Sequence, residues 1–328
     1  MAKADQVKAL IRSHAEGDDE RFYAIAMQVA AQAAHNGHAR FAQELRDLVD
    51  EAKMRGKVGP AGLRTRPVPV VAPRGELAGL LTAAYPKTRL ADMALDEGVR
   101  SRIDRVLLEQ RQRDRIREHG YSPVRRLLLI GPPGTGKTLT AAALAGELAI
   151  PLFTIQLDGL ITKYLGETAA KLRLVFDAIQ QTRAVYLFDE FDALGGERVL
   201  KNEVGEIRRV LNSFLQFLEI DESDSIIVAA TNHPKLLDRA LFRRFDTVIE
   251  YVLPAREIAE KVIRARLALL DTSDVDWSSV LGAAEGLSHA DLNRACEHAA
   301  KKAILAQRSR VGTSEIVESL GERRAAHG

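Results

Sequence analysis

The sequence predicts an α/β protein whose main domain is a layered sandwich built on a parallel, five-stranded sheet. From Arg125 onward, apolar runs of strand length alternate with segments in which apolar residues have helical spacing. Such alternation is typical of parallel strands joined by helical crossovers. After Pro254 the strand signal ends and only helical patterns follow. The five apolar runs are 127–130, 152–157, 184–188, 226–230 and 248–252.

Composition divides the chain into four regions. Residues 1–56 are Ala-rich with helical spacing and predict a small all-helical docking domain. Residues 57–75 are rich in proline and glycine and predict an extended linker. Residues 76–253 hold the α/β pattern, and residues 254–328 predict a C-terminal helical subdomain. Its four helical segments are expected to start near Ala255, Ser278, Ser288 and Thr313.

Charge and composition narrow the class of protein. The 328 residues are 46% hydrophobic and 28% charged, as in ordinary globular proteins of more than one domain. A formal net charge of +2 gives no strong field for nucleic acid or for a membrane surface. The single cysteine, Cys296, excludes an internal disulfide framework and fits a reducing compartment. Because neither a signal peptide nor a membrane-length apolar run is present, we expect a cytoplasmic protein without membrane association.

Residues 126–138, R-L-L-L-I-G-P-P-G-T-G-K-T, predict a strand, a glycine-rich turn and the start of a helix. They contain G-x-x-x-x-G-K-T, the phosphate-binding loop of P-loop NTPases, whose backbone N–H groups and helix dipole face a phosphate chain. Lys137 is expected to reach the β- and γ-phosphates, and the Thr138 hydroxyl to hold Mg²⁺. The residues expected to hold the nucleotide are Gly131, Pro132, Pro133, Gly134, Thr135, Gly136, Lys137, Thr138 and Leu139.

A second strand, in the run A-V-Y-L-F-D-E, ends in two acidic residues. At the carboxyl edge of the sheet, Asp189 is expected to help hold the Mg²⁺ bound by Thr138. Glu190 is expected to orient or deprotonate a water that attacks the γ-phosphate, which favours hydrolysis over a small-molecule kinase reaction. Asn232 ends another apolar strand and is expected to sense the γ-phosphate through a hydrogen bond, although a lone asparagine is more often a turn former.

Four motifs follow one another in the order G-P-P-G-T-G-K-T, L-F-D-E-F-D-A-L, A-A-T-N-H-P and L-D-R-A-L-F-R-R-F-D. Together they resemble an AAA-family ATPase with a single ATPase domain, over roughly residues 85–320. The resemblance implies a P-loop NTPase αβα sandwich with strand order 5-1-4-3-2, a C-terminal helical lid and a homohexameric ring. It also implies that ATP and Mg²⁺ are bound, and it gives catalytic roles to Lys137, Asp189, Glu190 and Asn232.

The same resemblance assigns Arg243 and Arg244 as arginine fingers, which neutralise charge on the phosphoryl group being transferred. The commonest family form separates the two arginines by Pro-Gly, whereas their adjacency here is similar to katanin and spastin. The alternative is a pair of surface arginines that bind nearby acidic residues.

The lid sequence G-L-S-H-A-D-L, residues 286–292, is similar to the family motif G-x-S-G-A-D-L, with His289 in place of glycine. By this resemblance His289 and Ala290 lie beside the adenine, and Met93 is placed in the adenine pocket on the same ground. Ser288 and Asp291 also form a helix-capping pattern.

The segment T-K-Y-L-G-E, residues 162–167, resembles the central-pore loop of the family. An aromatic ring offers a flat apolar surface that can contact an extended peptide without demanding a particular sequence. The residues expected to grip a polypeptide are Lys163, Tyr164 and Leu165, and the alternative is that Tyr164 packs on its own domain. Residues 195–202 are expected to form a second pore loop.

These features predict an ATPase that remodels, unfolds or threads a polypeptide substrate through a homohexameric ring. The N-terminal helices are expected to recruit a substrate, an effector or a partner protease. Two other classes of function remain open. One is a nucleic-acid-associated motor or loader, against which the near-neutral charge and the absence of a basic stripe argue. The other is a nucleotide-gated scaffold that threads nothing.

Overall fold

The computed structural model describes residues 75–160, 165–194, 204–237 and 239–326, together with Met27, Ala30, Gln43 and Pro73. The chain divides into two compact units, Met1–Pro67 and Val68–Gly328, and the break falls within the proline-rich stretch 57–75. Apart from Met27, Ala30 and Gln43, the predicted N-terminal helical domain lies outside the described residues, as does most of the predicted linker, so the four-part division remains a prediction.

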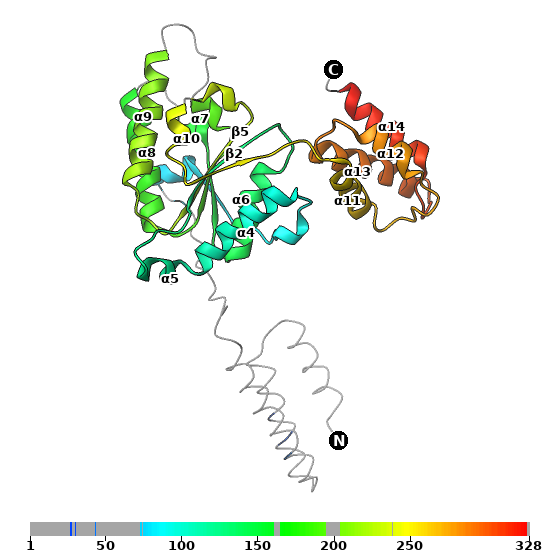
Figure 1. Cartoon of the computed structure of the whole chain (residues 1–328), viewed down its shortest axis with the longest axis horizontal. Coiled ribbons are helices and arrows are strands. Elements are labelled where there is room, and N and C mark those ends of the chain that lie inside the picture. The colour runs from blue at the N-terminus through cyan, green and yellow to red at the C-terminus, as the bar shows by residue number, and fades with distance from the viewer. Residues whose placement is uncertain are drawn as a thin grey trace. The chain divides into compact units, whose positions relative to one another are not determined.

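A six-stranded sheet forms the centre of the second unit (Figure 1). The strands are β1 (Leu81–Ala84), β2 (Arg126–Ile130), β3 (Leu152–Ile155), β4 (Val185–Phe188), β5 (Ile226–Thr231) and β6 (Thr247–Glu250). Their order is β1-β3-β4-β5-β2-β6, and every pairing among β2 to β6 is parallel. The predicted α/β class is confirmed, and the five parallel strands, counted from β2, lie in the expected order.

The sheet differs from the prediction by its edge strand. β1 pairs antiparallel with β3, which places Leu81 opposite Ile155 and Ala84 opposite Leu152. β1 has four residues, of which only Leu81 is buried. So short and exposed an edge strand has neither a continuous apolar run nor a clear alternation, and the sequence pattern therefore does not reveal it.

Helices connect the strands and build the C-terminal lid. In the α/β part they are α4 (Glu97–Arg111), α5 (Arg113–Glu118), α6 (Lys137–Leu148), α7 (Leu157–Leu160), α8 (Leu165–Gln181), α9 (Val204–Ile220) and α10 (Arg239–Phe242). The 3-10 turns are η1 (Gly75–Gly79), η2 (Leu90–Asp92), η3 (Phe191–Leu194) and η4 (Pro234–Leu236). The lid helices are α11 (Arg256–Arg266), α12 (Trp277–Ala284), α13 (His289–Leu305) and α14 (Thr313–Ala325). All four lid helices begin within one residue of the predicted positions.

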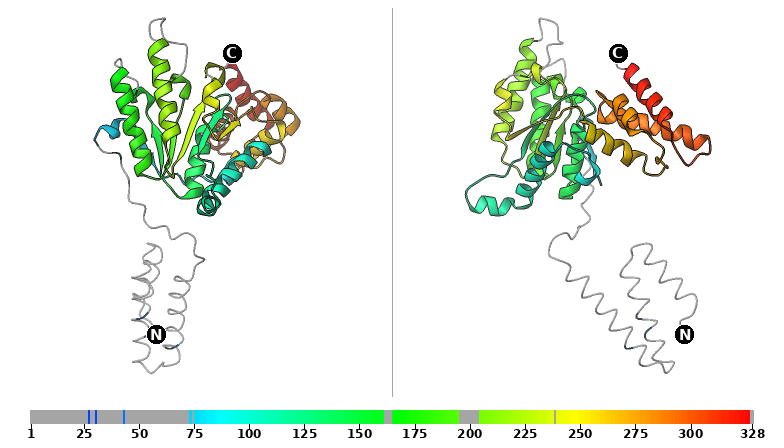
Figure 2. Two further views of the ribbon diagram at one scale, coloured as in Figure 1. Left: turned by 60° about the vertical axis from the view of Figure 1, so that its left-hand side comes forward. Right: turned by 45° about the vertical axis from the view of Figure 1, so that its right-hand side comes forward.

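Helices cover both faces of the sheet, with α8 and α9 on one face and α4 and α6 on the other (Figures 1 and 2). Leu127 and Leu129 of β2 join the core on the α4 and α6 side, whereas Leu128 joins the core on the α8 and α9 side. All three leucines are fully buried. A strand buried on both faces is apolar at every position, and this explains why β2 is evident in the sequence.

A cluster of aromatic rings supports the turn that carries the acidic pair. The Phe214 ring of α9 lies 5.0 Å from the Phe188 ring and 4.8 Å from the Phe191 ring, measured between centroids. These three side chains are fully buried. Because Phe188 and Phe191 flank Asp189 and Glu190 in the chain, this cluster fixes the backbone on both sides of the two acids.

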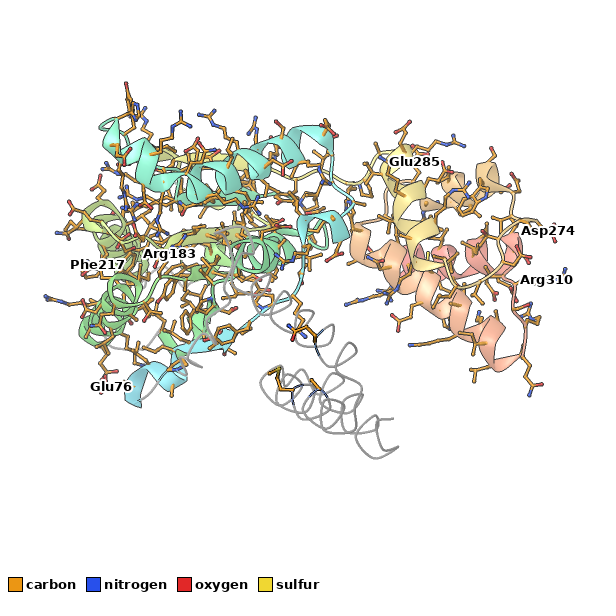
Figure 3. All side chains as sticks on the ribbon, turned by 90° about the horizontal axis from the view of Figure 1, so that it is seen from below. Glu76, Arg183, Phe217, Asp274, Glu285 and Arg310 are labelled. Atoms are coloured by element: carbon orange, nitrogen blue, oxygen red, sulfur yellow. The ribbon has the colours of Figure 1, made fainter. Side chains whose placement is uncertain are left out.

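The lid helices enclose a hydrophobic core of their own. Asp276 accepts a hydrogen bond from the Ser278 N–H at the start of α12, and Ser288 caps α13 in the same way. Asp274 and Arg310, labelled in Figure 3, form an ion pair of 3.8 Å on this subdomain. Among the described residues, no helix combines the length and the apolar character needed to cross a membrane.

We expect Phe214→Ala to lower the free energy of unfolding by about 3–5 kcal/mol, because it opens a cavity in the aromatic cluster. The matched control is Leu269→Ala, since the Leu269 side chain is 100% exposed. Urea unfolding followed by circular dichroism measures both variants. Equal midpoints for the two variants would contradict the role given to the cluster.

Candidate functional site

The phosphate-binding loop joins the carboxyl end of β2 to the start of α6. Gly131, Gly134 and Gly136 have φ values of +142°, +73° and +103°, which residues with a Cβ rarely adopt. Packing excludes a Cβ as well: on Gly131 it would lie 2.2 Å from the carbonyl oxygen of Tyr251. On Gly134 it would lie 2.5 Å from the Ser288 Oγ of the lid. Glycine is therefore required at these two positions by both conformation and space.

Lys137, the first residue of α6, folds back over this loop. Its side chain is buried, and its Nζ donates hydrogen bonds to the carbonyl oxygens of Gly131 at 2.8 Å and Pro132 at 2.7 Å. Burial lowers the pKa of Lys137, while the charges of Asp189 and Asp192 oppose this shift. The loop thus holds an ammonium group in its concave side, where a phosphate oxygen can take over its hydrogen bonds.

Thr138 and Asp189 meet across the edge of the sheet. The Thr138 hydroxyl donates to Oδ2 of Asp189 at 2.6 Å, and the backbone N–H of Glu190 donates to Oδ1 at 3.0 Å. A hydroxyl beside a carboxylate supplies only oxygen ligands, which suit Mg²⁺ held by one carboxylate, water and substrate phosphates. The donor set therefore fits the metal that the sequence predicts.

Glu190 has an unusual backbone conformation. Its φ is +49°, in the left-handed region that non-glycine residues seldom occupy, and its side chain is exposed. The neighbouring turn stabilises this conformation in two ways. Phe191 is fully buried, and the Ala193 N–H donates to the Glu190 carbonyl oxygen at 2.8 Å. Strained residues of this kind cluster at functional sites, and here the strained residue carries an exposed carboxylate shortly after the end of β4.

Two residues of the site carry no role in the sequence analysis. The buried Thr231 hydroxyl donates to Oδ1 of Asp192 at 2.8 Å and accepts from the His233 N–H at 3.0 Å. Thr231 immediately precedes the half-buried Asn232, and Asp192 lies two residues after Glu190, so this bond ties the ends of β4 and β5 together. The second aspartate of the D-E-F-D motif, Asp192, was the signal available in the sequence.

A cavity of about 420 Å³ lies between the α/β part and the lid. Met93, Leu139 and His289 line it, together with Thr135 and Gly136 of the phosphate loop. The cavity is large enough for a nucleoside, and it continues from the loop that would hold the phosphates. The structure thus brings the predicted adenine-pocket residues Met93 and His289 to one place.

His289 joins the lid to the segment that precedes α4. Its Nε2 lies 3.0 Å from the carbonyl oxygen of Ala94. Because a carbonyl oxygen only accepts, Nε2 carries the hydrogen and donates it. Burial lowers the pKa of His289, although the hydrogen bond to Ala94 opposes this shift, so the ring is neutral at physiological pH.

Ala290 lies on the other side of the loop. Its backbone N–H donates to the carbonyl oxygen of Gly134 at 3.0 Å. It lines a second cavity, of about 480 Å³, bordered by Pro132, Pro133 and Arg294. Ala290 therefore contacts the phosphate loop rather than the cavity that contains Met93.

The structure does not bring Arg243 and Arg244 to this site. Both side chains are exposed, and Arg244 forms an ion pair with Glu219 near the end of α9. Asp246 accepts hydrogen bonds from the backbone N–H groups of Arg125 and Arg126, at the start of β2. The arginine pair thus lies at the amino edge of the sheet and the phosphate loop at the carboxyl edge.

The predicted pore residues lie largely outside the described residues. Lys163 and Tyr164 belong to the gap 161–164, and the predicted second pore loop belongs to the gap 195–203. Leu165 and Gly166, which the sequence places in the loop, are instead the first residues of α8.

A glycine-rich loop between strand and helix, with Lys137 and Thr138 beside the acids of another strand, defines a P-loop NTPase. The family model for the ATPase family associated with various cellular activities (AAA) matches residues 127–253. The AAA family ATPase y4kL of Sinorhizobium fredii is 33% identical over 320 residues, which cover 98% of this chain and 95% of y4kL. The chain belongs to the AAA family, and it is an ATPase that binds ATP.

Two further similarities concern parts of the chain. The ATP-dependent zinc metalloprotease FtsH 1 of Methylacidiphilum infernorum is 33% identical over 251 residues, or 74% of this chain. The matched part spans 40% of the length of that relative. The crystal structure of the FIGL-1 AAA domain matches with a TM-score of 0.59 and 23% identity, covering 76% of this chain and 90% of that domain. This last similarity supports the fold.

We expect Glu190→Gln to reduce ATP turnover by about 10²–10⁴-fold, because the amide cannot accept a proton from the attacking water. Nucleotide affinity should stay close to that of the unmodified protein, since the phosphate loop is unchanged. Phosphate release and fluorescent-nucleotide titration measure the two quantities, with the exposed Glu118→Gln on α5 as control. Turnover within twofold of the control would remove Glu190 from this role.

Proposed function

We propose that the protein is a homohexameric ring that uses ATP hydrolysis to remodel, unfold or thread a polypeptide. The position of the arginine pair supports the ring most directly. β2 has five residues, so its two ends lie about 13 Å apart. Arg243 and Arg244 lie near one end and the phosphate loop follows the other. An arginine that assists hydrolysis is therefore supplied by a neighbouring chain.

In this proposal each polar side chain at the carboxyl edge of the sheet has one task. Lys137 exchanges its loop carbonyls for the β- and γ-phosphate oxygens. Thr138 and Asp189 hold Mg²⁺, which neutralises charge on the phosphates. Glu190 accepts a proton from the attacking water, and Asn232 donates a hydrogen bond to this water or to the γ-phosphate. The hydrogen bond between Thr231 and Asp192 fixes the positions of Glu190 and Asn232 relative to each other.

The polypeptide substrate is supported by sequence similarity to FtsH and by the segment around Tyr164. FtsH 1 is an ATP-dependent zinc metalloprotease, and its similarity to the present protein extends over 74% of the present chain. Leu165 begins α8, Lys163 and Tyr164 precede it in the sequence, and in this proposal these three residues contact the bound peptide. The N-terminal residues 1–56 then serve to recruit the substrate or an effector.

The in-trans role of the arginines is tested by mixing two inactive variants. Arg243→Ala combined with Arg244→Ala should lose about 10³-fold or more in turnover, and Lys137→Ala should lose nucleotide binding. In a mixed ring, some interfaces pair an intact phosphate loop with intact neighbouring arginines. We expect mixing to restore measurable ATPase activity, whereas activity equal to the sum of the separate variants would exclude shared sites.

Tyr164→Ala separates a threading machine from a nucleotide-gated scaffold. We expect this variant to retain most of its ATPase activity but to lose the unfolding of a fluorescent model substrate, because the aromatic side chain that contacts the peptide is removed. Tyr121→Ala is the matched control, since the Tyr121 side chain is 73% exposed. If Tyr164→Ala still unfolds the substrate at the control rate, the threading proposal is wrong. ATPase activity stimulated by DNA would instead favour a nucleic-acid motor.

A further inference from the structure

The 420 Å³ cavity has one wall from the segment Ala91–Leu95 and another from the lid helices α11 and α13. It also borders Thr135 and Gly136 of the phosphate loop. Because Met93 and His289, the two residues expected beside the adenine, line this cavity, we assign it to the base of a nucleotide whose phosphates lie on the loop. The hydrogen-bond donors and acceptors of the cavity wall then decide which base binds.

Asn293 supplies the carboxamide of this wall. It lies four residues after His289 on α13, so the two side chains share one face of the helix, and both line the cavity. A carboxamide has an N–H donor next to a carbonyl acceptor. Adenine presents the complementary pair, with a donor at N6 beside an acceptor at N7, and asparagine binds this edge through two hydrogen bonds. Guanine presents two acceptors there, O6 and N7, so one of the two bonds is lost.

Arg266 could instead favour guanine, as could Lys261, which also lines the cavity, because guanidinium and ammonium groups bind O6 and N7 of guanine. Arg266 lines the cavity, but its Nη2 lies 3.5 Å from Oε2 of Glu297, one turn beyond Asn293 on α13. Both side chains of this pair are about half exposed. The ion pair holds the guanidinium near Glu297, and the carboxamide of Asn293 is the group whose donor and acceptor match the adenine edge.

His289 fixes the position of α13 against the opposite wall. Its Nε2–H donates to the Ala94 carbonyl oxygen, and the adjacent Ala290 N–H donates to Gly134. The other ring nitrogen, Nδ1, is buried without a hydrogen-bond partner among the described residues. A buried acceptor without a partner is unfavourable for folding. The bond to Ala94 therefore indicates a positional role for this ring, at the place where the resembled motif has glycine.

We propose that Asn293 selects adenine by hydrogen bonding to N6 and N7 of the base, and that His289 is a positioning residue that holds Asn293 in reach. The proposal rests on the assignment of this cavity to the base. Binding of ADP requires neither hydrolysis nor threading. Failure of the ring proposal would therefore leave the measurements below unchanged.

The test is competition of ADP, GDP and 7-deaza-ADP, which lacks N7, against a ribose-labelled fluorescent ADP on the full chain. For the unmodified protein we expect 7-deaza-ADP to bind about fivefold more weakly than ADP, the effect of one hydrogen bond. Asn293→Ala should weaken ADP about tenfold. The same variant, and the isosteric Asn293→Asp, should bind ADP and 7-deaza-ADP equally, because the donor to N7 is gone. The control is Arg294→Ala, since Arg294 lines the other cavity.

His289 is tested by a conservative rescue. His289→Ala should reduce the preference for ADP over GDP about fivefold, whereas His289→Gln, which keeps an N–H donor for Ala94, should restore most of it. A 7-deaza penalty that persists in Asn293→Ala would overturn the proposal, as would an equal change of base preference in Arg294→Ala. An equal loss of preference in both His289 variants would reduce His289 to a packing residue and overturn its positioning role.

Discussion

The hydrogen bond between Thr138 and Asp189 depends on the register of three neighbouring strands. Thr138 follows β2 and Asp189 follows β4, and β5 lies between these strands in the sheet. Parallel pairing sets Leu128 of β2 and Phe188 of β4 opposite the same residue of β5, Ala229. The strand ends therefore meet at one edge, and the two side chains approach to 2.6 Å. A slip of one residue would turn alternate side chains to the other face and separate them.

The lid completes the site through few polar contacts. His289 bonds to Ala94 beside the base cavity, and Ala290 bonds to Gly134 within the phosphate loop. Both acceptors are backbone carbonyls that belong to the walls of the nucleotide site. If the lid can adopt two positions, a nucleotide shifts the equilibrium between them. The size of this shift is the difference between the free energies with which the nucleotide binds the two positions. In the proposed ring, the lid is therefore placed where occupancy of the site can be transmitted to a neighbouring chain.

The arginine pair is the part of the chain on which the proposed ring depends. Asp246 holds its segment against the start of β2 through two backbone N–H groups, and Arg244 is paired with Glu219. These contacts anchor the arginines at the amino edge of the sheet, a full strand length from the loop. If the two halves of a hydrolytic site lie at opposite edges of one fold, joining them takes two chains. In the proposed ring, hydrolysis is then a property of the interface between neighbouring chains.

The sequence by itself determined the parallel strands, the phosphate loop, the acidic pair and the lid helices, because each depends on consecutive residues. Buried strands read as apolar runs, and a loop that requires left-handed backbone reads as glycine. Tertiary structure alone decided the pairing of β1, the bond between Thr231 and Asp192, and the contact of His289 with Ala94 across 195 residues. It also decided that Ala290 meets the loop and that the arginine pair lies far from it. Such contacts depend on strand order and on the packing of distant segments, and local patterns do not encode these.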